Sequence, residues 1–388
     1  MIFKSNFPNA PTVNMVIDGV AVDYTAINAV SVSFAENEHD YAEFSVSGLI
    51  PSAVTDYINR PVYISIAYGP TNQSFFHGYI AFIEPVAETR KGYINNSAIQ
   101  HAKLICFGTS YDMSNKKSRV WEKHTLKRIV ETLASDYKYS FQIPTDSFVF
   151  SRLTQDKETD FAFLVKVCKS LGYRVTVSNG HIHVYDPFAS ISRAMPYAEL
   201  TNLVNSQGNA TYSPGRIMEF RGTFGSRTTQ GSSDSFTFET MDNNGQLITH
   251  STGSESMDLG QVVPARFNNT VTMNTFSQEA LKKYALGAVK NRAPFHAEAI
   301  VTGLPEVLPG SLVKLSNYNG KFDGFWMVSK VTQNISRSNY TTELSLVKDS
   351  TNDALPVITS GTTYTAPQQP VVIGGTWVSP LATGYAYA

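Results

Sequence analysis

The chain has 388 residues, which is too long for one ordinary hydrophobic core and predicts two or more domains. Its 31 basic and 32 acidic side chains give a net charge of −1, and this balance argues against a nucleic-acid-binding protein, which would carry a basic field or stripe. Charged residues make up only 16%, below the roughly 25% of average soluble domains, so uncharged polar residues supply much of the surface.

The sequence gives no sign of export or of membrane insertion. Residues 1–8 lack the apolar segment of a signal peptide, and no apolar run approaches 18 residues. We therefore expect synthesis in the cytoplasm and no transmembrane segment. The two cysteines, Cys106 and Cys168, are too few for a zinc site and imply no disulfide framework, so buried free thiols are expected.

Short alternating strands with turns between them fill the first third of the chain. Asp18-Gly19 is a hairpin-type turn, and Glu84-Pro85 ends the longest run. Several short strands at this spacing predict an all-β barrel or sandwich. The expected strands are 13–17, 20–22, 30–34, 44–46, 61–66, 75–83 and 102–107.

Two amphipathic helices follow. Residues 125–134 carry apolar side chains at helical spacing, namely Leu126, Ile129, Val130 and Leu133. The second helix spans 159–171, is apolar on more than one side, and is expected to be buried on more than one side. Thr159 is its predicted N-cap, and Asp160 puts negative charge in its first turn. Residues 137–155 between the helices are expected to be a polar-aromatic link.

A tight hairpin completes this block. Gly172 ends the second helix as a C′ glycine does, and residues 173–177 then alternate as a strand does. Asn179-Gly180 is the strongest short hairpin signal, and Ile182 and Val184 alternate on the return strand.

The remaining chain returns to β structure. Residues 188–262 are irregular, with strands expected at 216–221 and 235–239. A third helix is predicted to begin after the N-cap Ser277, with an i,i+4 pair between Glu279 and Lys283. Further strands are expected at 297–301, 312–315, 325–331 and 341–347, and an extended tail after residue 350.

The helix–helix–hairpin block resembles one in the tail and baseplate hub proteins of bacteriophages. The motif that carries the resemblance is Thr159-Asp160-Phe161-x-Phe163-Leu164, which leads into Leu171-Gly172-Tyr173 and then the hairpin. The same family includes the late-control protein D group and the N-terminal part of the type VI secretion spike. Motifs similar to its second barrel are Gly303-Leu-Pro305, Pro309-Gly310, Gly324-Phe-Trp326-x-Val328 and Tyr340-Thr-Thr-Glu-Leu344.

Two β segments also resemble each other. Pro61 to Ile66, followed by Phe76-His-Gly-Tyr-Ile80 and Ile83, resembles Pro309 to Leu315, followed by Phe322-Asp-Gly-Phe-Trp326 and Val328. Each has a turn at proline, an alternating strand, a polar loop and a Phe-x-Gly-aromatic strand. Two explanations remain open, chance similarity between β segments and two related barrels in one chain.

The expected fold is mainly β with an α+β insert: two similar β-barrel domains separated by a helix–helix–hairpin domain, and an extended C-terminal tail. The expected domains are 1–117, the first barrel; 118–200, the helix–helix–β-hairpin domain; 201–262, strands and loops with a possible insertion; 263–350, a helix and the second barrel; and 351–388, the tail.

Three histidines are candidates for metal binding or catalysis. His181 and His183 could present two imidazoles on one strand face, but no third ligand lies nearby in the sequence, so a solvated strand face is expected. His77 is expected at a packed barrel position. We predict no metal site and no cofactor.

Cell-wall hydrolysis is the enzymatic alternative, since some phage tail proteins degrade cell wall. This chemistry needs two carboxylates across a cleft, and Glu84, Glu122 and Glu158 fit ordinary turn and surface roles instead. The sequence has no Gly-x-Ser-x-Gly, His-Glu-x-x-His, Walker A or Gly-x-Gly-x-x-Gly motif. We therefore expect no enzyme; a tail-associated peptidoglycan or glycan hydrolase and a glycan-binding β-module remain the alternatives.

The tail is rich in aromatic residues. Tyr364, Trp377, Tyr385 and Tyr387 occur in an extended Pro/Gly-containing segment, a composition that suits docking onto a partner. We predict that these four residues bind a partner; the alternative is a low-complexity tail without one.

The resemblance implies a structural function in the virion. A hub protein of this family forms a trimer whose six barrels make a pseudo-sixfold ring, which adapts a sixfold tail tube or distal tail protein to a threefold spike or tip protein. The implied ring lets the tape-measure protein and DNA pass, with no stable nucleic-acid binding. Assembly is expected in the host cytoplasm, and the final location at the tail tip or baseplate.

Overall fold

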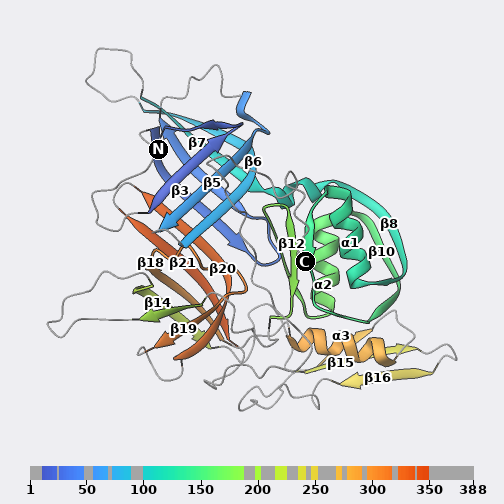
Figure 1. Ribbon diagram of the computed structural model, residues 1–388. Helices are drawn as coiled ribbons and strands as arrows, with labels where there is room; N and C mark the ends of the chain where they lie inside the picture. The colour runs from blue at the N-terminus through green and yellow to red at the C-terminus, as the bar shows by residue number, and fades with distance from the viewer. Residues whose placement is uncertain are drawn as a thin grey trace.

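The protein is mainly β, with a large curled sheet, a compact α/β lobe beside it and a smaller layer under the lobe (Figure 1). A computed structural model describes residues 11–23, 26–47, 56–68, 72–88, 99–187, 197–201, 215–224, 235–241, 246–251, 268–272, 278–290, 295–316, 322–336 and 339–348. No helix within these ranges is long and apolar enough to cross a membrane.

The first half of the large sheet comes from the N-terminal third of the chain. Its inward side chains alternate with exposed ones, as the period of two requires, and they form a core with Phe44, Ile64 and Leu104 at its centre. The strands are β1 (Thr12–Ile17), β2 (Val20–Ala21), β3 (Ile27–Ala35), β4 (Tyr41–Ser47), β5 (Pro61–Tyr68), β6 (Asn72–Glu88) and β7 (Ile99–Gly108).

The second half of the large sheet comes from the C-terminal part of the described chain. It has its own core, in which the Trp326 side chain is fully buried and stacks on Phe322. The strands are β13 (Tyr197–Thr201), β14 (Ile217–Phe224), β18 (Phe295–Thr302), β19 (Leu312–Ser316), β20 (Gly324–Ser336) and β21 (Tyr340–Lys348).

The two halves repeat one strand order. Across the first half the order is β3-β4-β7-β6-β5-β1, and across the second half it is β14-β18-β21-β20-β19-β13. Strands at matching places also follow one another in the same sequence along the chain. The one difference in direction is that β1 runs antiparallel to β5, whereas β13 runs parallel to β19.

Matching β-bulges support this correspondence. One extra residue interrupts the pairing of β3 with β4 at Asn28, and of β14 with β18 at Met218. A second bulge interrupts β6 against β7 at Ala81, and β20 against β21 at Ser329. Because a bulge changes the local twist, equal bulges at equal places indicate equally curved halves.

The bulges correct the sequence-based alignment of the two β segments. The Phe-x-Gly motifs suggested that Gly78 corresponds to Gly324, but counting from the bulges places Gly78 at Trp326. Gly78 pairs with Val62, and Trp326 pairs with Val313, which confirms the shifted correspondence. The alignment by motif was two residues wrong because Phe76 and His77 lie within β6, whereas Phe322 and Asp323 precede β20.

One antiparallel junction joins the halves into a continuous sheet. β20 pairs with β3 from Lys330 opposite Ala35 to Ser336 opposite Ala29. Polar side chains face each other on the side away from the cores: the hydroxyl of Ser31 donates to Asn334 Oδ1 at 2.8 Å, and the hydroxyl of Thr332 donates to Ser33 Oγ at 3.1 Å.

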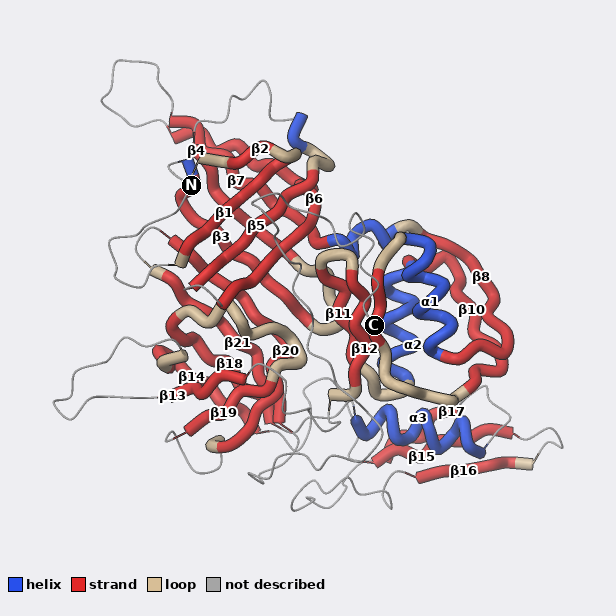
Figure 2. Tube along the Cα trace, viewed as in Figure 1, coloured by secondary structure: helices blue, strands red, loops and turns tan. Residues whose placement is uncertain are grey.

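The α/β lobe contains the predicted helices and hairpin, together with a β-ribbon. Figure 2 shows both helices enclosed between the β8–β10 ribbon and the β11–β12 hairpin. The elements are the 3₁₀ helix η3 (Thr109–Ser114), β8 (Lys116–Thr125), α1 (Leu126–Tyr137), β9 (Ser140–Gln142), β10 (Val149–Thr159), α2 (Asp160–Ser170), β11 (Arg174–Ser178) and β12 (His181–Tyr185).

Local signals in this lobe are confirmed, except at the link. Thr159 caps α2 by accepting a hydrogen bond from the Ala162 N–H at 3.1 Å, and Gly172 has the positive φ of a C′ glycine. Asn179 and Gly180 both have positive φ, as a type I′ turn requires. The expected link 137–155 was wrong, because β9 and most of β10 lie there. These strands were not predicted because their many polar residues hide the apolar-polar alternation by which a strand is recognised.

A third unit packs beneath the lobe. Its three strands form a small sheet in the order β16-β15-β17, covered by α3. Gly287 of α3 lies so close to the end of α2 that an added Cβ would be 2.3 Å from the Ser170 carbonyl oxygen. Lys283 binds Asp146 at 2.9 Å. The predicted N-cap Ser277 lies outside the described residues. The elements are β15 (Ser235–Met241), β16 (Leu247–Ser251), β17 (Asn268–Thr272) and α3 (Gln278–Lys290).

Candidate functional site

The turn between β3 and β4 binds the lobe to the large sheet. Asn37, at positive φ, forms two hydrogen bonds with Val175 of β11: its N–H donates to the Val175 carbonyl at 2.8 Å, and its side-chain oxygen accepts from the Val175 N–H at 3.3 Å. Glu36 accepts a hydrogen bond from the Tyr185 hydroxyl, and Asp40 accepts one from Ser178. Residues 36–40 therefore form one contact between the sheet and the lobe, and the Asn179 side chain, which donates to the Phe75 carbonyl of β6 at 3.2 Å, forms another.

Two buried carboxyl groups in this contact have strongly raised pKa values. Burial raises the pKa of Glu36 to about 7, although the Arg174 charge and the Tyr185 hydrogen bond oppose the rise. Burial likewise raises the pKa of Asp40 to about 7, against the hydrogen bond from Ser178. A raised carboxyl pKa can mark a catalytic acid, but both groups face packed structural neighbours, so they serve the contact between lobe and sheet.

The expected solvated position of His181 and His183 is wrong. His183 is buried, its ring stacks on Tyr185 at 4.9 Å between centroids, and burial lowers its pKa to about 3. His181 accepts from or donates to Ser140 Oγ at 2.8 Å, and burial lowers its pKa to about 4. The reason is that β12 is the central strand of its three-stranded sheet and has both faces covered.

The other histidine is confirmed in a packed position: the His77 ring stacks on Tyr63 at 4.2 Å between centroids. Among the described residues, no group of three or more His, Cys, Asp or Glu side chains is placed to hold a metal ion. Cys106 and Cys168 are buried free thiols, as expected.

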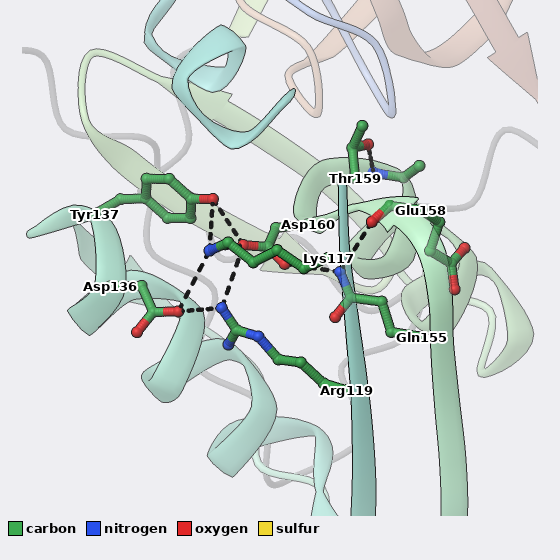
Figure 3. A network of polar contacts seen from close by, with 9 residues as sticks. Lys117, Arg119, Asp136, Tyr137, Gln155, Glu158, Thr159 and Asp160 are labelled. Carbon is green, nitrogen blue, oxygen red and sulfur yellow. Dashed lines mark hydrogen bonds and ion pairs between the residues drawn. The ribbon is translucent and has the colours of Figure 1, made fainter. Parts of the chain in front are cut away.

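Asp160 organises the largest polar network of the lobe (Figure 3). Its fully buried carboxylate accepts hydrogen bonds from Gln155 at 2.7 Å, from Lys117 at 2.6 Å and from the Tyr137 hydroxyl at 2.6 Å. Arg119 lies 3.6 Å from the same carboxylate. Strands β8 and β10 and both helices are thereby joined at one buried point.

The network neutralises its own charges. Lys117 and Arg119 lie between Asp160 and a second carboxylate, Asp136, which Arg119 binds at 2.6 Å (Figure 3). Burial alone would raise the pKa of Asp160, but its hydrogen bonds and the Arg119 charge outweigh burial and lower it. A carboxylate with lowered pKa and every oxygen bound cannot act as a general acid, so the network stabilises the lobe.

From the sequence, Asp160 is predictable only as a negative charge in the first turn of the second helix. The alternation of Lys117 and Arg119 along one face of a strand was a usable signal, because two cations on one strand face need anionic partners when that face is covered. The signal was missed because β8 was not predicted as a strand.

The three glutamates that are candidates for hydrolysis lie on three different strands. Glu84 lies on β6 in the large sheet, whereas Glu122 lies on β8 and Glu158 on β10 in the lobe. Glu158 binds Lys166 of α2. Glu158 is therefore ion-paired, and Glu84 lies in a different sheet from the other two glutamates.

The outer face of the second half of the sheet carries a shallow polar hollow of about 310 Å³. Charges of both signs line it, with Glu219, Glu298 and Glu343 beside Arg221 and Lys330. Because its charges are mixed, this face does not present the uniform basic charge that binds a polyanion. The four predicted partner-binding residues of the tail, Tyr364, Trp377, Tyr385 and Tyr387, lie outside the described residues.

Comparisons with known proteins support the fold. The model of a family described as the Alg8 N-terminal domain matches residues 32–337. No curated protein matches the chain. Among solved structures, a tail protein from Neisseria meningitidis MC58 is similar with a TM-score of 0.64 and 14% identity, over 89% of this chain and 99% of that one.

Two further structures have the same fold. The 43 kDa tail protein of prophage MuSo2 from Shewanella oneidensis gives a TM-score of 0.63 at 12% identity, over 88% of this chain and 99% of that one. An E. coli component of the type VI secretion system, described as similar to the T4 bacteriophage tail proteins gp27 and gp5, gives 0.55 at 10% identity, over 89% and 79%. The fold is thus one that phage tail proteins and a secretion component share.

Proposed function

Starting from the facts that the chain belongs to the family of the Alg8 N-terminal domain and has the fold of solved tail proteins, we propose that it is a structural hub of a phage tail tip or baseplate. The description of the family states no activity, so the proposal depends on the fold and on the architecture of the chain. In this proposal the protein is not an enzyme.

The observation that carries the proposal is the repeated half-sheet. Six strands occur twice in the same order, with bulges at the same places. Each half is, in our proposal, one barrel-like hub domain. Three chains then supply six equivalent halves, which can meet a sixfold tail tube or distal tail protein on one side.

The inserted units supply the threefold character. The lobe, residues 109–187, follows the first half only, and residues 225–294 interrupt the second half only, between β14 and β18. A trimer would therefore display six similar half-sheets but only three copies of each insertion. This arrangement fits a symmetry adaptor, whose threefold side would bind a spike or tip protein.

The charge distribution is compatible with a conduit. The net charge of −1 and the mixed charges of the outer sheet face would let the tape-measure protein and DNA pass without holding them. The tail residues Tyr364, Trp377, Tyr385 and Tyr387 are proposed to dock onto a neighbouring subunit or partner.

Native mass spectrometry of the purified chain tests the proposal. The expected result is a trimer, with a ring in electron micrographs; a version that ends at Lys348 tests whether the tail helps to hold the subunits. A strictly monomeric chain that hydrolyses peptidoglycan would contradict the proposal in favour of the hydrolase alternative. Glycan affinity without assembly would instead favour a glycan-binding module.

A further inference from the structure

The junction between the two halves pairs β20 with β3, and the equivalent strands β6 and β14 are not paired with each other in the described chain. Within the chain, the long strand of the second half, β20, pairs with the first strand of the first half, β3. In the first half the strand that corresponds to β20 is β6, and in the second half the strand that corresponds to β3 is β14. In the described part of the chain, β14 pairs only with β18, and the stretch of β6 beyond its bulge pairs only with β7.

These two open edges carry features of an interface. An open edge presents a row of backbone donors and acceptors that can pair with another strand. An exposed apolar side chain flanks each edge: Phe82 on β6 is 56% exposed, and so is Met218 on β14. Both side chains lie within two residues of the bulges that mark the corresponding stretches.

We infer that β14 of one chain pairs antiparallel with the stretch of β6 after its bulge in a second copy of the same chain. The inference rests on the proposed ring and specifies how its subunits are joined. It makes the contact between chains a repeat of the junction within each chain, because β6 and β14 correspond to β20 and β3 in the two half-sheets.

The bulges fix the register of this pairing. In the junction within the chain, Thr332 is the third residue after the β20 bulge and lies opposite Ser33, the fifth residue after the β3 bulge. The same count places Glu84 of β6 opposite Thr223 of β14. Both side chains are exposed, so the Thr223 hydroxyl can donate to the Glu84 carboxylate where Thr332 donates to Ser33.

Charge supports the same register. Arg221 lies two residues from Thr223 on the same face of β14, with its side chain 73% exposed. In an antiparallel pair, diagonal neighbours on one face remain within reach of long side chains. Arg221 of one chain would therefore approach Glu84 of the next, in addition to its own Glu219 at 2.5 Å.

Disulfide trapping tests the register. One full-length chain carries Glu84→Cys and a second carries Thr223→Cys; the two are mixed and mildly oxidised. Opposite residues in an antiparallel ladder have Cα atoms about 4.5–5.5 Å apart, within disulfide range. The matched control replaces Thr223→Cys by Glu219→Cys, four residues and about 13 Å further along β14. Cys106 and Cys168 are buried and stay silent.

The expected result is an interchain disulfide for the Glu84→Cys and Thr223→Cys mixture, at least ten times more abundant than for the control. A trimer that forms no such disulfide, or cross-links equally in both mixtures, overturns the strand pairing and leaves the proposed hub in place. A chain that remains monomeric by native mass and forms no cross-link overturns both.

A surface variant provides a second readout. Phe82→Asp should weaken assembly at least tenfold, because it replaces the exposed apolar ring at one end of the proposed joint by a carboxylate. Val20→Asp is the control, since Val20 is 69% exposed on β2 at the far end of the sheet. Equal assembly of the two variants would contradict the proposed pairing.

Discussion

Replacement of Asp160 by asparagine should selectively destabilise the α/β lobe. The asparagine side chain has the same shape but only one acceptor oxygen, and its NH₂ group must face either Gln155 or the Lys117 and Tyr137 donors. On either side a donor that now binds Asp160 at 2.6–2.7 Å loses its acceptor. The change also leaves Lys117 and Arg119 with only Asp136 to balance them.

The magnitude follows from the exposure of these partners. Breaking a fully buried ion pair from one side costs about 3–5 kcal/mol, and a hydrogen bond to a charged group contributes about 1.5–3 kcal/mol. The side chains of Lys117 and Arg119 are 31% and 26% exposed, so water can solvate part of their charge. We therefore expect a loss of about 2–4 kcal/mol in the free energy of opening the lobe.

Hydrogen exchange detected by mass spectrometry is the suitable assay, because it reports opening of the lobe separately from the sheet. Amides of α1, α2 and β8 should exchange faster in the variant, and those of β18 and β21 should not. Asp136→Asn is the matched control: its carboxylate is 35% exposed, so about 1 kcal/mol or less is expected.

The pH dependence gives a second criterion. The fold lowers the pKa of Asp160, so its contribution is present above the unfolded-state pKa of about 3.9 and is lost as the pH falls through the folded-state pKa. The difference between wild type and variant should stay constant from pH 7 to 5 and narrow only below about pH 4. Equal losses in Asp160→Asn and Asp136→Asn would refute the reasoning.

Two further predictions concern the large sheet. Burial raises the pKa of Glu36 from 4.5 to about 7, so its contribution to stability is complete below about pH 4.5 and is lost as the pH rises through 7. The free energy of unfolding of the wild type should therefore decline between pH 5 and 8, and Glu36→Gln should remove up to about 3 kcal/mol of this decline. A variant whose denaturation profile across this pH range equals that of the wild type would contradict the prediction. Gly78→Ala would place a Cβ 2.1 Å from the Phe107 carbonyl oxygen and should lower the free energy of unfolding, measured by thermal melts, by about 3 kcal/mol or more. Gly19→Ala is the control, because Gly19 lies in open space at φ +79°, and it should lower the free energy of unfolding by only about 1–2 kcal/mol. Comparable losses in the two variants would show that the sheet adapts at Gly78.

The sequence was most informative where one local rule decides the structure. Asn179-Gly180 specifies a type I′ turn, and Thr159 with Gly172 marks the two ends of α2, because each residue satisfies a backbone requirement of its own. The alternation in β5 and β18 likewise predicted strands, since each has one face against a core.

Prediction failed where pairing over long distances decides. β8 is polar at most positions and is a strand because β10, more than twenty residues later, pairs with it. His183 is buried because β12 is covered on both faces. The sequence pattern of the strand does not reveal the second covered face, because a histidine between apolar residues is read as a solvent-facing position. The β20–β3 junction joins residues about 300 positions apart, and neither strand pattern indicates its partner.

The repeated half-sheet also explains how open edges can be present without uncontrolled aggregation. A head-to-tail contact between identical chains gives either a closed ring or an endless filament, depending on the rotation at each joint. If the joint between chains repeats the β20–β3 junction, its rotation is set by the same bulges and the same curvature as the junction inside the chain. Closure then pairs every open β6 and β14 edge, which removes the surfaces that would otherwise recruit further strands. Among the described residues, no strand of the lobe and none of β15, β16 and β17 pairs with these edges, so in the proposed ring each insertion would remain available to a threefold partner.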